Sequence, residues 1–204
     1  MTDQPAAPAA TFADKPTLEG ERIVLRPVRP EEDLPWLRVM LQDPDVLKYT
    51  SPVHTPVAPE WDEAMEKRIV EWYSTRNEQP DRLDLIIVDR STGRGVGEVV
   101  LNEWDEPNRS CNLRICIGPD GRDRGFGTEA VRMATDHAIR TLGLNRVSLG
   151  VYAFNARGQR AYEKAGFKVE GIRRQVLRYG DRWIDDIDMA VLAAEWPGAD
   201  RGNQ

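Results

Sequence analysis

A short stretch between residues 122 and 128 combines arginines with glycines in a pattern suited to binding phosphate. It consists of Arg122, Asp123, Arg124, Gly125, Phe126, Gly127 and Thr128. A helix is expected to begin here, and a helix N-terminus exposes unpaired backbone N–H groups and the positive end of a dipole. The glycines let an anion approach the backbone, and guanidinium groups stay charged and match phosphate oxygens. The stretch therefore predicts binding of a phosphorylated cofactor.

One motif that this stretch resembles is the dinucleotide-binding fingerprint, through Gly125-x-Gly127-x-x-Ala130. That fingerprint requires the glycine turn directly after a strand and an acidic residue roughly 20 residues further on. Here residues 119–124 separate the preceding strand from the first glycine, and the next predicted strand, residues 146–154, contains no Asp or Glu. The dinucleotide interpretation is therefore disfavoured.

The elements on either side of the stretch are predicted from hydrophobic periodicity. Leu113, Ile115 and Ile117 alternate with polar residues, which is typical of a strand with one buried face. On the other side, apolar residues recur three or four positions apart, at Val131, Ala134, Ala138 and Leu142. This spacing predicts an amphipathic helix. The phosphate-binding stretch thus connects a strand to the N-terminus of a helix.

Composition limits the class of protein. A chain of 204 residues with 40% hydrophobic residues is expected to form one domain with a core. A net charge of -6 gives no general attraction to nucleic acid, and no apolar run approaches the ~18 residues of a membrane span. Without a recognisable leader segment, we expect a cytoplasmic protein without a nucleic-acid or membrane partner. Two His and two Cys offer no metal-ligand spacing, and Cys111 and Cys116, at an odd offset in one strand, should face opposite sides.

The remaining elements follow from periodicity and turn residues. Residues 1–16, rich in Ala and Pro, are expected to be a disordered tail, residues 17–196 the folded domain, and residues 197–204 a flexible C-terminus. Helices are predicted near residues 30–43, 60–76 and 155–165, a loop at 46–59, and strands at 22–28, 83–89, 95–104, 110–117, 146–154, 167–178 and 182–192. Because a helix connects the strands 110–117 and 146–154, these two strands should pair in parallel.

Several motifs together resemble the GNAT superfamily of N-acyltransferases. Arg-x-x-Gly-x-Gly, from Arg122 to Gly127, resembles the acyl-CoA pyrophosphate loop of that family. Asn155 closes the next strand, and residues 161–167 resemble the family's second cofactor segment, a helix that ends in Gly-Phe. Residues 179–186 are similar to the closing hairpin of the branch with ribosomal-protein N-terminal acetyltransferases and polyamine acetyltransferases. The order and spacing of these motifs cover the chain from about residue 18 to residue 196.

The resemblance implies a fold and a cofactor. The fold is a single GNAT-like α/β domain with a mixed, mostly antiparallel sheet of about seven strands, a central parallel pair and about four helices. The cofactor, which is also a co-substrate, is acetyl-CoA. Its pantetheine arm would lie where the two parallel strands separate and bond to backbone groups of Ile115, Cys116 and Ile117, and Asn155 would reach the same arm. Asn155 is equally suited to cap the helix that follows it.

The resemblance also implies roles in proton transfer. An attacking amine must lose a proton, and the departing thiolate must be neutralised. Tyr162 occupies the family's position for the acid that neutralises the thiolate, although a packed tyrosine is the alternative. Glu98 and Glu103 are the candidate bases; they are at an odd offset, so at most one should face the cleft. The central strand itself has no carboxylate, so the base could act through a water, or the amine could have a low pKa.

The expected function is transfer of an acetyl group from acetyl-CoA directly to a primary amine, either a protein N-terminus or a small amine. The alternative is a catalytically silent, CoA-binding regulatory module. The sequence does not identify the amine. A homodimer is also a hypothesis, since an edge strand in the last hairpin can pair with a second copy.

Overall fold

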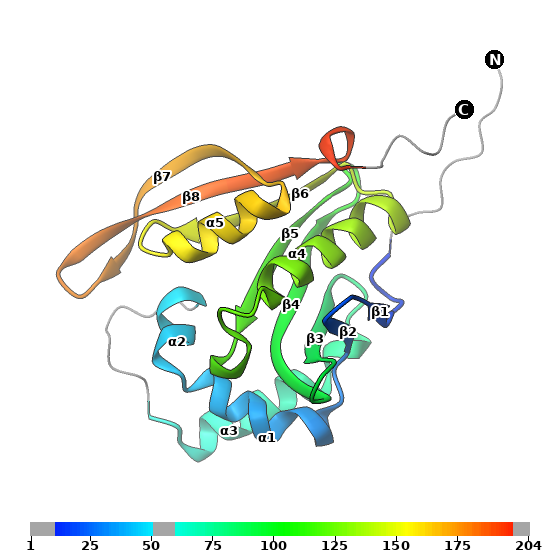
Figure 1. Ribbon diagram of the computed structural model, residues 1–204. Coiled ribbons are helices and arrows are strands. Elements are labelled where there is room, and N and C mark those ends of the chain that lie inside the picture. Colours follow the sequence, from blue (N-terminus) through cyan, green and yellow to red (C-terminus); the bar gives the residue numbers. More distant parts are fainter. Residues whose placement is uncertain (1–10, 51–59, 198–204) are drawn as a thin grey trace.

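The computed structural model describes residues 11–50 and 60–197, and these residues form a mixed sheet flanked by helices (Figure 1). The eight strands lie in the order β1-β2-β3-β4-β5-β6-β8-β7. Their bounds are β1 Leu18–Glu19, β2 Ile23–Pro27, β3 Leu83–Asp89, β4 Arg94–Asp105, β5 Ser110–Ile117, β6 Arg146–Tyr152, β7 Lys168–Tyr179 and β8 Arg182–Leu192. Among the described strands, only β5 and β6 pair in parallel.

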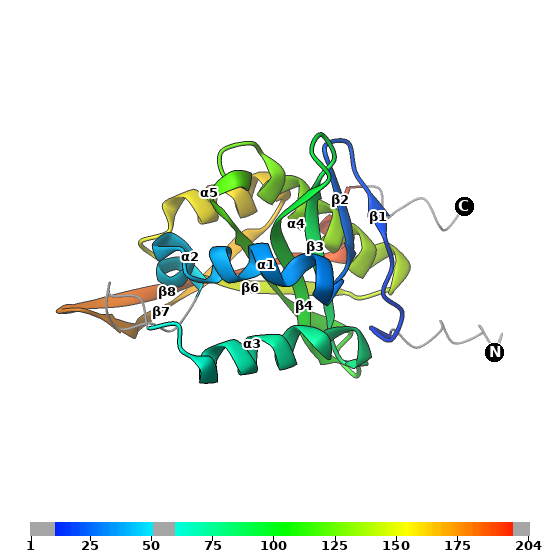
Figure 2. The same ribbon diagram turned by 90° about the horizontal axis from the view of Figure 1, so that it is seen from below.

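The described residues form five α-helices, which surround the sheet. They are α1 Pro30–Leu41, α2 Pro44–Thr50, α3 Glu63–Ser74, α4 Phe126–Asp136 and α5 Ala156–Ala165. The short turns are η1 Arg76–Glu78, η2 Pro119–Gly121, η3 His137–Thr141, which is a π-helical extension of α4, and η4 Ala193–Glu195. Helices α4 and α5 cover one face of the sheet, whereas α1 and α3 lie on the other, and α2 lies near the end of β5 (Figures 1 and 2).

The alternation of side chains along the strands separates two hydrophobic cores. The larger core packs α4 and α5 onto the sheet and contains Cys111 and Leu113 of β5. The smaller core packs α1 and α3 onto the other face and contains Cys116 of the same strand. Because the two cysteines lie in different cores, the prediction that they face opposite sides is confirmed, and both are free. The central strand is therefore buried on both faces, which fixes its position in the molecule.

The two parallel strands separate soon after they meet. The paired positions are Ser110 with Arg146, Cys111 with Val147, and Asn112 with Ser148. Strand β5 then continues to Ile117 and β6 to Tyr152 without further pairing to each other. The last residues of β5 therefore have backbone groups on the β6 side that no strand partner satisfies, next to the N-terminus of α4.

The predicted fold class is confirmed, with two differences in the elements. The two-residue strand β1 is an additional strand, too short to leave a periodic signal. The loop predicted at residues 46–59 is wrong for residues 46–50, which belong to α2. The helix forms because Pro44 suits its first turn and the Asp43 carboxylate accepts a hydrogen bond from the Val46 N–H at 2.9 Å. Residues 51–59 lie outside the described residues.

The predicted disordered tail is wrong for its last part. Phe12 is only 1% exposed, and its ring centroid lies 5.8 Å from that of Trp104. The Lys15 ammonium donates hydrogen bonds to the carbonyls of Gln79 and Arg82, both at 2.6 Å, and to that of Phe12. Residues 1–10 and 198–204 lie outside the described residues. The N-terminal segment is thus part of the larger core from Phe12 onwards.

The described residues were compared with the requirements of a membrane span and of a metal site. In residues 11–50 and 60–197, every helix falls short of the length and apolar character of a membrane span. In the same ranges, no His, Cys, Asp or Glu side chains group in threes to hold a metal ion.

Candidate active site

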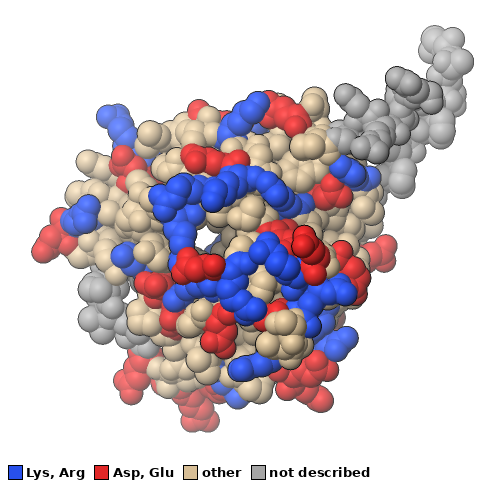
Figure 3. All heavy atoms as spheres, viewed as in Figure 1, with Lys and Arg blue, Asp and Glu red and all other residues tan. Residues whose placement is uncertain are grey.

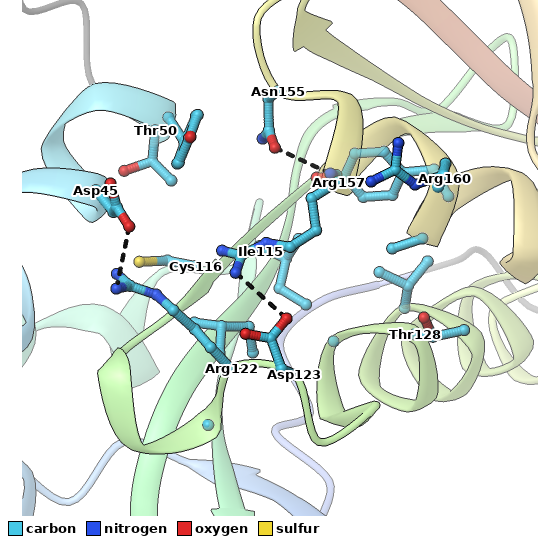
Figure 4. A pocket seen from close by; sticks show the side chains of 18 of the residues that line it. Asp45, Thr50, Ile115, Cys116, Arg122, Asp123, Thr128, Asn155, Arg157 and Arg160 are labelled. Carbon is cyan, nitrogen blue, oxygen red and sulfur yellow. Dashed lines mark hydrogen bonds and ion pairs between the residues drawn. The ribbon is translucent and has the colours of Figure 1, made fainter.

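A cavity of about 270 Å³ lies between α2, the end of β5, the start of α4 and one face of α5 (Figure 4). It thus occupies the place where β5 and β6 separate. Ten of the residues predicted for the site line it: Ile115, Cys116, Ile117, Arg122, Asp123, Gly125, Gly127, Thr128, Asn155 and Tyr162. The fold therefore brings residues 115–128 together with Asn155 and Tyr162 at one cavity.

The start of α4 forms one wall of the cavity. Gly125 precedes the helix with φ of 77°, a left-handed conformation that favours glycine. Gly127 lies in the first turn, and a Cβ there would come no closer than 3.6 Å to Ile117 and 4.0 Å to Ile115, two residues that also line the cavity. The first turn of α4 can therefore approach a ligand through its backbone, with the favourable end of the helix dipole toward the cavity.

The predicted role of Arg124 and Phe126 in binding the cofactor is not supported by their side chains. Arg124 forms an ion pair with buried Asp89 at 2.8 Å, and its guanidinium lies 4.4 Å from the centre of the Phe126 ring. Phe126 is 3% exposed and belongs to the larger core. Neither residue lines the cavity. The two side chains anchor the loop to the sheet. The Arg124 charge is paired with Asp89, and the Phe126 ring is packed in the larger core.

Arg122 does line the cavity, but two carboxylates already contact it. Its guanidinium forms ion pairs with Asp43 and, at 3.4 Å, with Asp45 at the start of α2 (Figure 4). The neighbouring Arg122 lowers the pKa of Asp43 despite the opposing effect of burial. Arg122 therefore ties the loop to α2, and its positive charge is largely neutralised.

Three cations that the sequence analysis did not single out line the cavity from α5. They are Arg157, Arg160 and Lys164, spaced so that they lie on one side of the helix. Arg157 forms an ion pair with Asp123 across the cavity at 3.5 Å. Figure 3 shows Lys and Arg side chains gathered around the hollow. Their helical spacing was present in the sequence, but it has the form of an ordinary solvated helix face.

Asn155 caps the helix that follows it, which is one of the two roles considered for it, and its contact with the cofactor arm stays a prediction. Its Oδ1 accepts a hydrogen bond from the Gly158 N–H at 2.9 Å, which caps α5. The same side chain lines the cavity (Figure 4). The cap fixes the side chain and leaves its amide N–H₂ as a donor at the cavity wall.

Tyr162 lines the cavity from the buried side of α5. Its side chain is 9% exposed, and burial, with a smaller effect from nearby Cys116, raises the pKa of Tyr162 to about 12. The phenol is therefore protonated at neutral pH and can act as a hydrogen-bond donor. It lies beside the end of β5, since Cys116 lines the same cavity.

The two candidate bases differ in position. Glu98 pairs in register with Cys116 and is half-buried; the Tyr73 hydroxyl donates a hydrogen bond to its Oε2 at 2.9 Å. Burial raises the pKa of Glu98, and the hydrogen bond from Tyr73 opposes that effect. Glu103 is exposed, has φ of 51° at an irregularity in β4, and lies toward the far end of the β4–β5 pairing. Neither glutamate lines the cavity, and the position of Glu103 argues against a role as base.

Comparisons with known proteins are consistent with this geometry. A family model described as "Acetyltransferase (GNAT) domain" matches residues 22–168. The Probable N-acetyltransferase YjcK of Bacillus subtilis is 32% identical over 131 residues, which are 64% of this chain and 72% of that protein. Spermidine N(1)-acetyltransferase of Escherichia coli is 27% identical over 174 residues, 85% of this chain and 88% of that protein. The structure of Mycobacterium smegmatis RimJ with CoA-disulfide superposes with a TM-score of 0.76 at 22% identity and covers 91% of both chains.

Proposed function

The chain belongs to the GNAT acetyltransferase family, and from this premise we propose that it transfers an acetyl group directly to a primary amine. GNAT acetyltransferases use acetyl-CoA, so the acyl donor of this protein is acetyl-CoA. The observation that carries the proposal is the cavity that joins a helix N-terminus, a row of cations and a protonated tyrosine at the separated strands. The amine class is consistent with the spermidine substrate named for one relative.

The residues present fit the phosphates and amides of acetyl-CoA. Arg157, Arg160 and Lys164 supply positive charge, and the first turn of α4 supplies backbone N–H groups. The Asn155 amide is a donor for an amide carbonyl. The unpaired end of β5, at residues 115–117, offers backbone groups of the kind that bind an extended amide-containing chain. When bound, acetyl-CoA supplies an activated acyl carbon and a thiolate leaving group.

The roles of Tyr162 and Glu98 follow from their protonation. The Tyr162 hydroxyl donates a hydrogen bond to the sulfur as the carbon–sulfur bond breaks, and its raised pKa keeps this proton in place until then. Glu98 accepts, through a bridging water, the proton that the amine loses as its nitrogen bonds to the acyl carbon. The raised pKa of Glu98 makes it a stronger base than an ordinary carboxylate. The departing sulfur would take the Tyr162 proton and Glu98 the amine proton, and return of that proton to the tyrosinate through water would reset both groups without a covalent enzyme intermediate.

The first experiment is a calorimetric titration of the protein with acetyl-CoA, with NADPH as the control ligand. Stoichiometric binding of acetyl-CoA alone supports the assignment of the cavity. Binding of NADPH instead would revive the dinucleotide interpretation. Binding of acetyl-CoA without release of CoA across a broad panel of amines would favour the silent regulatory module. That module is a specific alternative because neither Glu98 nor Glu103 lines the cavity.

The second experiment tests Tyr162 itself. We expect Tyr162→Phe to lower kcat by about 10²-fold or more, because the thiolate loses its proton donor, with little change in acetyl-CoA affinity. Phe167→Leu is the control, since its ring lies 6.3 Å from that of Tyr162 in the same core but carries no hydroxyl. A kcat for Tyr162→Phe equal to that of the wild type would remove Tyr162 from the mechanism.

A further inference from the structure

The face of the sheet away from α4 and α5 carries a group of charged and polar side chains near the separation of β5 and β6. Residues that pair across neighbouring strands project from the same face of a sheet. By register, Glu98 shares its face with Cys116, and Asp186 shares its face with Tyr152 and Arg173. Arg114 lies two residues before Cys116 and therefore projects on the same side as Glu98.

One pair in this group is already neutralised. The Asp186 side chain is nearly buried and forms an ion pair with Arg173, which also binds Asp188 at 2.9 Å. The carboxylate lies directly against Gly150, where a Cβ would come within 2.7 Å of its Oδ2. Arg173 therefore has two carboxylate partners, and it holds Asp186 in a fixed position on β8.

Arg114 differs from Arg173 in its partners. It is exposed, and it donates a hydrogen bond to the Thr50 carbonyl at the end of α2, at 3.3 Å. Among the described residues, no carboxylate lies within ion-pair distance of it. Burial raises the pKa of Glu98, and the positive charge of Arg114 opposes part of that rise. A guanidinium has five N–H donors in a planar fork, so this side chain has unused capacity for a carboxylate.

The positions of Arg114 and Glu98 also limit the size of a small molecule that contacts both side chains. Val100 pairs with Arg114 and Glu98 pairs with Cys116, so Glu98 and Arg114 are diagonal neighbours on β4 and β5. Such neighbours are about 7–8 Å apart at their backbones. A single small molecule can therefore contact both side chains only if its cationic and anionic groups are separated by a few bonds.

We propose that the acceptor is a small primary amine with a carboxylate on the adjacent carbon, an α-amino acid, and that Arg114 binds this carboxylate. Arg114 is then a specificity-determining residue that places the amine on the side of Glu98. The proposal rests on the proposed acetyl transfer. A polyamine is a poor fit, because its second ammonium would lie against the Arg114 guanidinium, and like charges at such distances repel.

The test compares each amino acid with its own amide, which removes the negative charge and keeps the amine. CoA release from acetyl-CoA is measured for glycine, alanine and serine, for their amides, and for spermidine. We expect kcat/KM for the acid to exceed that for the amide by tenfold or more, although the amide has the larger fraction of unprotonated amine at neutral pH. Preference of the wild-type enzyme for the amides or for spermidine would overturn the inference.

The variant Arg114→Gln should reduce the acid-to-amide ratio to within about twofold of one, mainly by a higher KM for the acid. The ratio is the informative quantity because any change in the pKa of Glu98 affects both substrates equally. Arg140→Gln, which removes an exposed arginine paired with Asp136 at the far end of α4, is the matched control and should keep the ratio. An unchanged ratio in Arg114→Gln would also overturn the inference.

The outcomes distinguish failure of the role proposed for Arg114 from failure of acetyl transfer. Release of CoA with any amine, but without preference for the acids, refutes the role of Arg114 and leaves acetyl transfer intact. Absence of CoA release with all of these amines, and also with peptides that carry a free N-terminus, refutes acetyl transfer itself.

Discussion

The hydrogen bond between Tyr73 and Glu98 predicts a measurable pH dependence. Glu98 acts as a base only when it is deprotonated, so kcat/KM should rise with pH through the pKa of Glu98. Because burial raises that pKa, this limb should lie above the ordinary carboxyl value of about 4.3. The measurement is a pH–rate profile with an acceptor amine of low pKa, which separates titration of Glu98 from titration of the amine.

Two variants assign this limb to Glu98. Glu98→Gln should remove the limb and lower the plateau. Tyr73→Phe removes a hydrogen bond that lowers the pKa of Glu98, so the limb should move to higher pH by about one unit, the equivalent of one hydrogen bond to a charged group. Movement of the limb to lower pH in Tyr73→Phe would contradict this account.

At the residue scale, the sequence predicted chemistry where local patterns determine it. Tyr162, Asn155 and the glycines were predicted from motif order, and the structure brings them to one cavity. The partners of the arginines were not predictable, because Asp43 and Asp89 are distant in sequence and meet Arg122 and Arg124 only in the folded chain. The roles of Tyr162 and Glu98 in catalysis stay predictions.

At the scale of the element, the two glycines at the start of α4 should respond differently to alanine. Gly127→Ala places a methyl group at the cavity wall without a clash, so stability should be unchanged or higher by about 0.5–1 kcal/mol. Acetyl-CoA affinity should fall tenfold or more, because the helix start loses its close approach. Gly125→Ala imposes a positive φ on alanine and should cost about 1 kcal/mol or more of stability.

Thermal unfolding and calorimetry of the same two proteins measure these effects. Wild-type affinity for acetyl-CoA in Gly127→Ala would show that the first turn of α4 does not contact the ligand. Equal stabilities of the two variants would contradict the conformational argument for Gly125.

The elements themselves were predicted where periodicity is long. Alternation predicted β5 and the three-to-four spacing predicted α4, since each pattern extends over several repeats, whereas β3 and β4 were predicted as strands on either side of a turn. Helix α2 was missed because Pro52, Pro56 and Pro59 favoured a loop for all of residues 46–59, although the seven residues of the helix precede all three prolines. The π-helical turn at residues 137–141, which ends with a hydrogen bond from the Leu142 N–H to the His137 carbonyl, has no sequence signal.

At the scale of the whole molecule, composition predicted one domain with a hydrophobic core. It did not predict that the sheet separates this core into two. Strand β5 carries Leu113 on one face and Cys116 on the other, so each core depends on the same strand. The parallel pairing with β6 was predictable from the crossover helix, whereas the early end of that pairing came only from the family resemblance. The homodimer through the edge of β7 stays a prediction.

The N-terminal segment gives the last prediction, which concerns stability. Phe12 is buried against the larger core, so Phe12→Ala should lower the free energy of unfolding by about 3 kcal/mol. Lys15→Met should cost about 1–3 kcal/mol, because three backbone carbonyls lose the ammonium that they bind. Val39→Ala, at a side chain that is 67% exposed, is the control and should be close to neutral. Urea denaturation measures all three, and a loss below about 0.5 kcal/mol in Phe12→Ala would mean that this segment is not part of the core. Phe12, Lys15 and Val39 do not line the cavity, so all three folded variants should bind acetyl-CoA as the wild type does.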